Sequence, residues 1–78
     1  MPRYFFNVEG GRFPPEDKVG TVLANADQAR SQAVITAGEM LKYADREFWN
    51  RPEWRMHVTD EDGATVCILI IRGMTRVD

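Results

Sequence analysis

Residues 66–71 read Val-Cys-Ile-Leu-Ile-Ile, a run of six apolar side chains without a polar break. Such a run, rich in β-branched residues, is typical of a strand that carries apolar side chains on both of its faces. In a chain of 78 residues the core is small, and one helix covers only one face of a sheet. The run therefore predicts a sheet whose second face needs cover from another source.

Composition limits how so small a domain can be stabilised. Domains of about 60–80 residues often rely on disulfides, a metal ion or a second subunit. Cys67 is the only cysteine, which excludes an internal disulfide, and Cys67 with His57 are too few soft ligands for a structural zinc site. We expect no metal and no cofactor, which leaves oligomerisation as the source of support.

The charges and the ends of the chain restrict its partners. Ten Lys and Arg against twelve Asp and Glu give a net charge of −2, with the two signs interspersed. This argues against nucleic acid as a partner, because phosphate binding gains affinity from clustered positive charge. No stretch approaches the ~20 apolar residues that cross a bilayer, and neither the start nor the cysteine content indicates export. We therefore expect a cytoplasmic protein without a membrane span.

Hydrophobic periodicity predicts two hairpins that flank one helix. The prediction is an α+β fold of order β-β-α-β-β, with the helix packed on a three- or four-stranded antiparallel sheet. It forms one domain over residues 1–78, in which 72–78 are a loose tail and 12–18, with two prolines, are a loop or an edge. The predicted strands are 3–8, 19–23, 53–59 and 64–71.

The helix has a start signal, a stop signal and an apolar stripe. Asn25 is suited to be the N-cap, with Gln28 three residues on as in a capping box. Pro52 disfavours helix at the residue before it, so the helix should end between Arg46 and Asn50. The stripe is mostly alanine, which lets the helix backbone approach the sheet closely. Its members are Ala26, Ala29, Ala33, Ala37, Met40, Leu41, Ala44 and Phe48.

An acidic turn that ends in Gly63 decides which faces of the second hairpin meet. A three-residue loop with a left-handed Gly63 and a bulge pairs Asp60 with Ala64 and puts Val66 and Ile68 on the helix side of the sheet. A two-residue turn would shift the pairing by one residue and exchange the partners. We favour the bulged loop, because it groups the apolar side chains of the two strands.

In the favoured register, four apolar side chains lie on the face opposite the helix. Covering several hundred Å² at ~25 cal/mol per Å² yields a free energy comparable with the whole stability of a small domain. We therefore expect a homodimer, through this face or through an exposed edge strand. The alternative is a monomer in which Arg3, Arg55 and the C-terminal tail fold over the face. The expected interface residues are Phe5, Cys67, Leu69 and Ile71.

Two segments, MPRYFF at residues 1–6 and VTDEDG at 58–63, resemble a family of short bacterial proteins known only as a domain of unknown function. The family is frequent in rhizobia and related alphaproteobacteria. The likeness extends over nearly the whole chain and includes the Gly-Gly-Arg turn at 10–12 and the acidic loop around Asp17. Many members have histidine where this chain has Asn7, so a chemical role for that position is not implied. The resemblance implies a free-standing β-β-α-β-β protein and no activity or substrate.

Three groups of residues could carry chemistry, and each has a simpler structural explanation. His57 and Cys67, as neighbours across the hairpin, could form a thiolate nucleophile, but a thiol in an apolar run is buried and inert. The acidic turn at 60–63 resembles part of a calcium loop and lacks the further ligands. Glu16 and Asp17 are adjacent carboxylates in a loop that we expect to be solvated. We therefore predict no catalytic residue.

Aromatic and basic residues gather where the helix joins the third strand. Aromatics interleaved with arginines can stack bases or bind acidic peptides; alternatively, the tryptophans close the end of the core and the arginines are solvated. We expect a non-enzymatic protein-interaction module that acts as a homodimer, with a further protein partner left open. A nucleic-acid-associated regulator is the alternative, followed by a Cys/His enzyme. The candidate ligand surface is Arg46, Trp49, Arg51, Trp54 and Arg55.

Overall fold

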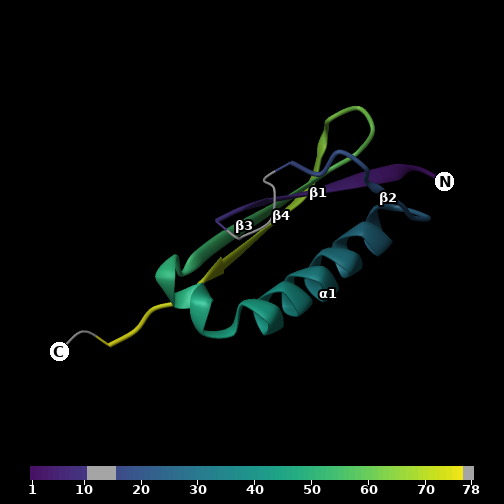
Figure 1. The fold of residues 1–78 in the computed structure, drawn as a ribbon. Coiled ribbons are helices and arrows are strands. Elements are labelled where there is room, and N and C mark those ends of the chain that lie inside the picture. The colour runs from purple at the N-terminus through teal and green to yellow at the C-terminus, as the bar shows by residue number, and fades with distance from the viewer. Residues whose placement is uncertain (11–15, 77–78) are drawn as a thin grey trace.

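The structure is a computed structural model that describes residues 1–10 and 16–76. A four-stranded antiparallel sheet of order β2-β1-β3-β4 packs one face against a long helix (Figure 1). This confirms the predicted α+β fold and its element order. Among the described residues, no helix is both long enough and apolar enough to span a bilayer. The elements are β1 Arg3–Glu9, β2 Thr21–Val22, α1 Ala26–Ala44, the 3-10 helix η1 Asp45–Asn50, β3 Glu53–Thr59 and β4 Thr65–Arg72.

Helix α1 begins at the predicted cap. The side chain of Asn25 accepts a hydrogen bond from the backbone N–H of Gln28 at 3.0 Å, and the side chain of Gln28 accepts one from the N–H of Ala24 at 3.0 Å. The reciprocal bond therefore goes to the residue before the cap, which differs slightly from a capping box. The α-helix ends at Ala44, and η1 continues the helical run to Asn50, two residues before Pro52.

The core lies between α1 and one face of the sheet. Alternate side chains of β1 and β3 point into it, as predicted, and the alanine stripe of α1 closes over them. Phe48 in η1 completes one end through edge-to-face contacts with Trp49 and Trp54, each with ring centroids 5.4 Å apart. The buried members are Tyr4, Val8, Ala29, Ala33, Ala37, Met40, Phe48, Trp54, Met56 and Val58.

The second hairpin has the predicted turn but a different register beyond it. The N–H of Asp60 donates to the carbonyl of Ala64 at 3.0 Å, and Gly63 has a φ of 82°, as a three-residue loop requires. Thr59 then pairs with Thr65, whereas Val58 pairs with Cys67. Val66 is therefore an extra, unpaired residue in β4, in addition to the bulge at the turn. Because of it, every later side chain of β4 lies on the face opposite to the one that we predicted.

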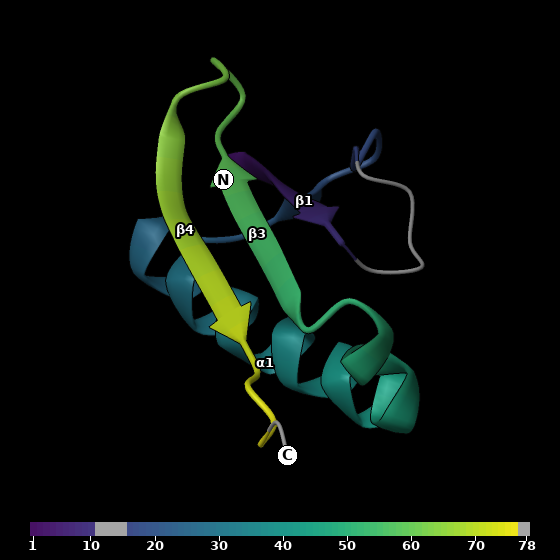
Figure 2. The ribbon, with the colours of Figure 1, turned by 90° about the vertical axis from the view of Figure 1, so that its left-hand side faces the viewer.

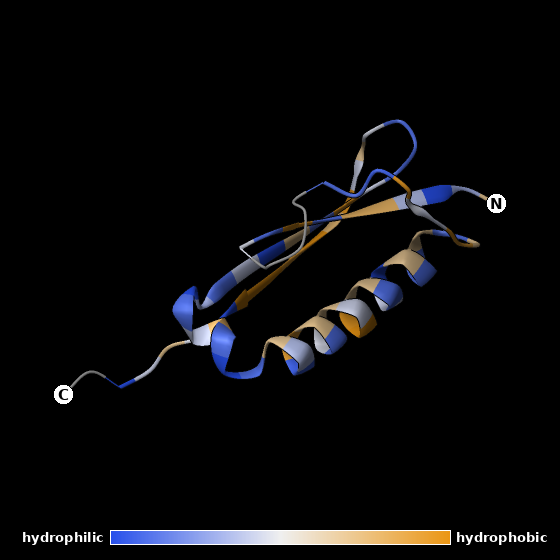
Figure 3. Ribbon diagram, in the orientation of Figure 1, coloured by the Kyte–Doolittle hydropathy of each residue, from blue (hydrophilic) through white to orange (hydrophobic). Residues whose placement is uncertain are grey.

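The register places the apolar run of β4 the other way round from our prediction. Cys67, Leu69 and Ile71 pack against the core on the helix side, and Ile68 and Ile70 lie on the open face, which is the face of the sheet opposite α1. The prediction that Cys67, Leu69 and Ile71 lie on the open face is wrong. Of the four expected interface residues, Phe5 alone is there. Figure 3 shows the hydrophobic colour along β4 and in the middle turns of α1.

Two predicted segments are only partly described. The second strand, predicted over residues 19–23, is confirmed as the shorter β2, which pairs with Arg3 and Tyr4. The predicted loop over 12–18 is described from Glu16 onward, and its first part lies outside the described residues. The predicted tail lies outside them at 77–78, and residues 73–76 have no regular secondary structure.

Candidate interaction surface

The two sides of the sheet differ in how many of their outward backbone groups are bonded within the chain. On one side β2 covers only the first part of β1. Next to it, the carboxylate of Asp17 accepts the backbone N–H of Phe6 at 3.1 Å, together with those of Val19 and Gly20 at 3.0 and 2.9 Å. A backbone donor of β1 that could pair with a foreign strand is therefore already bonded within the chain.

The loop that carries Asp17 is anchored to the sheet by Asn7. The backbone N–H of Asp17 donates to Oδ1 of Asn7 at 2.9 Å, and Nδ2 of Asn7 donates to the carbonyl of His57 at 3.1 Å. Burial acts to raise the pKa of Asp17, but hydrogen bonds from the N–H groups of Gly20, Phe6 and Val19 outweigh it and lower the pKa below its ordinary 3.8. Asp17 is thus an anchored anion, rather than the solvated carboxylate that we expected.

The other edge, β4, is bare. Figure 2 shows β4 at one side of the sheet, with β3 beside it and β1 beyond. Within residues 1–10 and 16–76, no strand pairs with the outer side of β4. The segment 65–71 contains no proline, glycine or charged residue. Ile68 and Ile70 are 53% and 52% exposed on it. Between the irregularity at Val66 and the charged Arg72, the strand therefore has none of the proline, glycine or charged residues by which exposed edges often avoid pairing.

The hydrogen-bond pattern identifies which backbone groups of β4 are free. The N–H of Gly73 donates to the carbonyl of Pro52 at 2.8 Å, so this pair belongs to the bonded positions of the β3–β4 ladder. Bonded and non-bonded pairs alternate along an antiparallel ladder. Cys67, Leu69 and Ile71 therefore direct their N–H and C=O groups toward β3. Those of Ile68, Ile70 and Arg72 point outward, and we call this row the free edge of β4.

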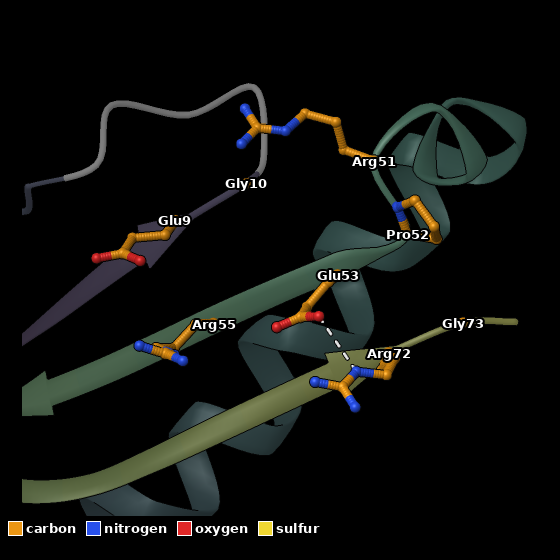
Figure 4. Close-up of a pocket in the computed structure, with 8 residues that line it drawn as sticks. All are labelled: Glu9, Gly10, Arg51, Pro52, Glu53, Arg55, Arg72 and Gly73. Atoms are coloured by element: carbon orange, nitrogen blue, oxygen red, sulfur yellow. Dashed lines mark hydrogen bonds and ion pairs between the residues drawn. The ribbon is translucent and has the colours of Figure 1, made fainter.

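The candidate ligand surface is divided by the sheet. Trp54 lies in the core with 5% of its surface exposed, whereas its neighbour Arg55 is on the open face. Arg51 and Arg55 line an open depression of about 530 Å³ together with Arg72, and we call it the arginine depression (Figure 4). Arg46 and Trp49 are exposed outside it. Trp54 therefore does not lie beside the arginines, and it cannot stack a base on the surface that they form.

The arginine depression is not purely basic. Glu9 and Glu53 also line it, and Nε of Arg72 lies 3.1 Å from Oε2 of Glu53. In Figure 4 the Arg51 side chain extends over Gly10 toward the end of β1. Sequence reasoning missed Arg72 because the depression depends on the true register, which puts Arg72 directly opposite Glu53.

The two residues considered for nucleophilic catalysis do not meet. His57 is on the open face opposite Ile68, and its Nε2 lies 2.7 Å from Oγ1 of Thr65. Cys67 is opposite Val58 and packs against the core. In the acidic turn, Oδ1 of Asp60 is already bonded to backbone N–H groups within the turn. In the described part of the chain, no cluster of three or more His, Cys, Asp or Glu is arranged to hold a metal ion.

A protein-family model matches most of the chain. Residues 3–72 match the model of a family described as a domain of unknown function, DUF6894. This range runs from the first residue of β1 to the last residue of β4, so the family model covers the complete sheet and helix. No curated protein and no solved structure matches the chain.

Proposed function

The chain belongs to the DUF6894 family, and we propose that it is a non-enzymatic protein-interaction module that acts as a homodimer through β4. The observation that carries the proposal is the free edge of β4, where Ile68 and Ile70 are half-exposed. At the opposite edge, the outward N–H of Phe6 is already bonded to Asp17. A long edge strand whose outward backbone groups have no partner is suited to strand addition.

A dimer that pairs two β4 edges accounts for the exposed isoleucines better than a dimer in which two open faces stack on each other. Around Ile68 and Ile70, the open face carries polar and charged side chains, namely Asn7, Glu9, Glu53, Arg55 and His57. These would have to lose water in a face-to-face dimer without gaining apolar contact. The two isoleucines lie on the outermost strand, where pairing of edges covers them and leaves the charged side chains solvated.

The isoleucines alone are not enough for a stable dimer. Fully burying an isoleucine contributes about 1.5–3 kcal/mol, so completing the burial of four half-exposed ones gives about 3–6 kcal/mol. A micromolar dissociation constant corresponds to about 8 kcal/mol. The difference must come from the backbone ladder and from further contacts that accompany strand pairing.

The alternative functions gain less from the arrangement. A nucleic-acid-associated regulator would need the tryptophans beside the arginines, and Trp54 is buried on the helix side. A Cys/His enzyme would need His57 near Cys67, and the sheet backbone lies between their side chains. The proposed interaction module requires neither a tryptophan beside the arginines nor a His57–Cys67 pair.

The test is the solution mass at micromolar concentration, measured by analytical ultracentrifugation. We expect about twice the chain mass of 8.9 kDa for the wild type and the single-chain mass for Ile70→Lys, with unchanged circular dichroism. Tyr43→Lys is the matched control, because Tyr43 is 83% exposed on α1, and it should remain dimeric. A wild-type protein that stays monomeric at about 100 µM, far above a micromolar dissociation constant, would overturn the proposal.

A further inference from the structure

We infer that the dimer joins the free edges of two antiparallel β4 strands with Leu69 on the two-fold axis, giving one continuous eight-stranded sheet. This inference rests on the function proposed above and specifies its geometry. Antiparallel pairing matches outward-pointing residues of one strand with outward-pointing residues of the other. The residues available on each strand are Ile68, Ile70 and Arg72, which leaves a small set of symmetric registers.

The side chains discriminate among these registers. An axis at Leu69 pairs Ile68 with the partner's Ile70, so that the four isoleucines form one apolar group. An axis at Ile70 would pair Ile68 with the partner's Arg72, an aliphatic side chain against a charge. An axis at Ile68 would pair Ile70 with the partner's Val66, where the irregularity interrupts the strand. Only the axis at Leu69 keeps both isoleucines in a regular ladder with apolar partners.

Charge complementarity favours a second copy of this chain in antiparallel orientation. Three arginines and two glutamates line the arginine depression, so this end of the sheet has a net positive charge. The opposite end carries the acidic turn, with Glu61 and Asp62 exposed. Antiparallel pairing of two copies brings the basic end of each toward the acidic end of the other, whereas parallel pairing would bring like charges together.

Helix α1 supplies a further contact in this arrangement. A two-fold axis through the β4 strands puts both helices on the same face of the joined sheet. Gln32, Thr36 and Met40 line a groove with β1 residues, so this flank of α1 faces away from β4. By helical periodicity the flank toward β4 contains Val34, which is 62% exposed. Val34 therefore points toward the partner's helix and adds apolar area where the isoleucines alone are insufficient.

Disulfide trapping tests the register. A directly opposed, non-hydrogen-bonded pair has a Cα separation of about 4.5 Å, which a disulfide can bridge. We expect Cys67→Ser/Leu69→Cys to form a symmetric cross-linked dimer on mild oxidation. Cys67→Ser/Ile71→Cys should not cross-link, because Ile71 lies opposite the partner's position 67. Ile71→Cys with the native Cys67 should cross-link.

Helix variants give an independent readout that needs no oxidation. We expect Val34→Lys to raise the dimer dissociation constant about tenfold or more. Ile35→Lys should leave the dissociation constant unchanged, because Ile35 is 51% exposed and lies on the side of the helix away from the sheet. Retained circular dichroism would show that both variants fold.

The outcomes separate the register from the proposed function. A monomeric wild type refutes the dimer itself. A wild-type dimer that fails to cross-link at position 69, or that cross-links through Ile68→Cys or Ile70→Cys in the Cys67→Ser background, refutes the Leu69 axis and leaves the interaction module standing. Equal effects of Val34→Lys and Ile35→Lys would refute the helix contact.

Discussion

The carboxylate of Asp17 accepts the backbone N–H of Phe6 at 3.1 Å. This contact joins a loop to β1 beyond the residues that β2 covers, and it removes a donor that a foreign strand could use. The same carboxylate binds the N–H groups of Val19 and Gly20, so one side chain both shapes its loop and occupies a backbone donor of β1. The outer strands of the sheet are the two-residue β2 and the eight-residue β4, so β4 is the longer open edge within the described residues.

Stability should depend on the ionisation of Asp17. Its folded-state pKa lies below the ordinary 3.8, so the stabilisation is present above that value and is lost as pH falls through the folded pKa. We expect Asp17→Asn to lower the free energy of unfolding at pH 7 by about 1 kcal/mol, since the residue is partly exposed. The difference from wild type should shrink between about pH 4 and pH 2, measured by urea denaturation at fixed protein concentration.

Glu16→Gln is the matched control for this pH dependence. Glu16 is exposed and adjacent in sequence, and it makes none of the three contacts to Phe6, Val19 and Gly20. Glu16→Gln should leave the free energy of unfolding within about 0.5 kcal/mol of wild type, both at pH 7 and at the acid end of the range. Equal behaviour of the two variants would contradict the role assigned to Asp17.

The register of β4 predicts slow modification of Cys67. Its side chain packs against the core on the helix side and is only partly exposed, so a neutral alkylating reagent has restricted access to it until the hairpin opens. We expect thiol labelling to be at least about tenfold slower than for a model thiol and to become fast above the unfolding midpoint in urea. Rapid labelling of the native protein would indicate the register in which Cys67 faces outward.

Local signals in the sequence were sufficient for most of the fold. Asn25 identifies the start of α1 because its side chain satisfies a free amide of the first turn. The alternation of Trp54, Met56 and Val58 with polar residues leaves only one face of β3 that can enter the core. The alanine stripe likewise allows only one side of α1 to pack. In each case, turning the element over would bury charge or expose large apolar side chains.

The face of β4 could not be predicted in this way. A strand that is apolar on both sides buries similar area whichever side it turns inward, so its own pattern does not choose a register. The turn residues, with Gly63 left-handed, determine the loop but not the irregularity at Val66, three residues after Gly63. Val66, the extra residue, has an ordinary strand side chain. The choice depends on how Leu69 and Ile71 fit beneath α1, which is a tertiary effect.

The candidate site was only partly predictable for the same reason. The closeness of Arg51 and Arg55 in sequence predicts that they are neighbours, and both line the arginine depression. Arg72 joins them because of the register of β4. Trp54 was grouped with them because it adjoins Arg55 in sequence, although adjacent residues of a strand point to opposite faces.

Replacing Gly73 or Gly38 by alanine should change the free energy of unfolding in opposite directions. A Cβ built on Gly73 would lie 2.6 Å from Cε2 of Phe48 and 2.9 Å from Cζ3 of Trp49, so the rings must move. We expect Gly73→Ala to reduce the free energy of unfolding by about 1–3 kcal/mol. Gly38→Ala, in α1 with no atom within 4 Å, should increase it by about 0.5–1 kcal/mol. Thermal unfolding at one protein concentration compares them, and a neutral Gly73→Ala would contradict the close contact with Phe48.

The close approach of α1 to the sheet makes its alanines sensitive to added volume. Ala33 is 2% exposed at the centre of the buried stripe, and interiors packed at this density tolerate extra methylenes poorly. We expect Ala33→Leu to lower the free energy of unfolding by about 1–3 kcal/mol. Ser31→Leu, on the exposed side of the same helix, should change it by less than about 0.5 kcal/mol, although leucine is the better helix former. Urea denaturation measures both. If Ala33→Leu were as stable as wild type, α1 would have room above β3 and β4, and the dependence of the β4 register on packing beneath the helix would lose its basis.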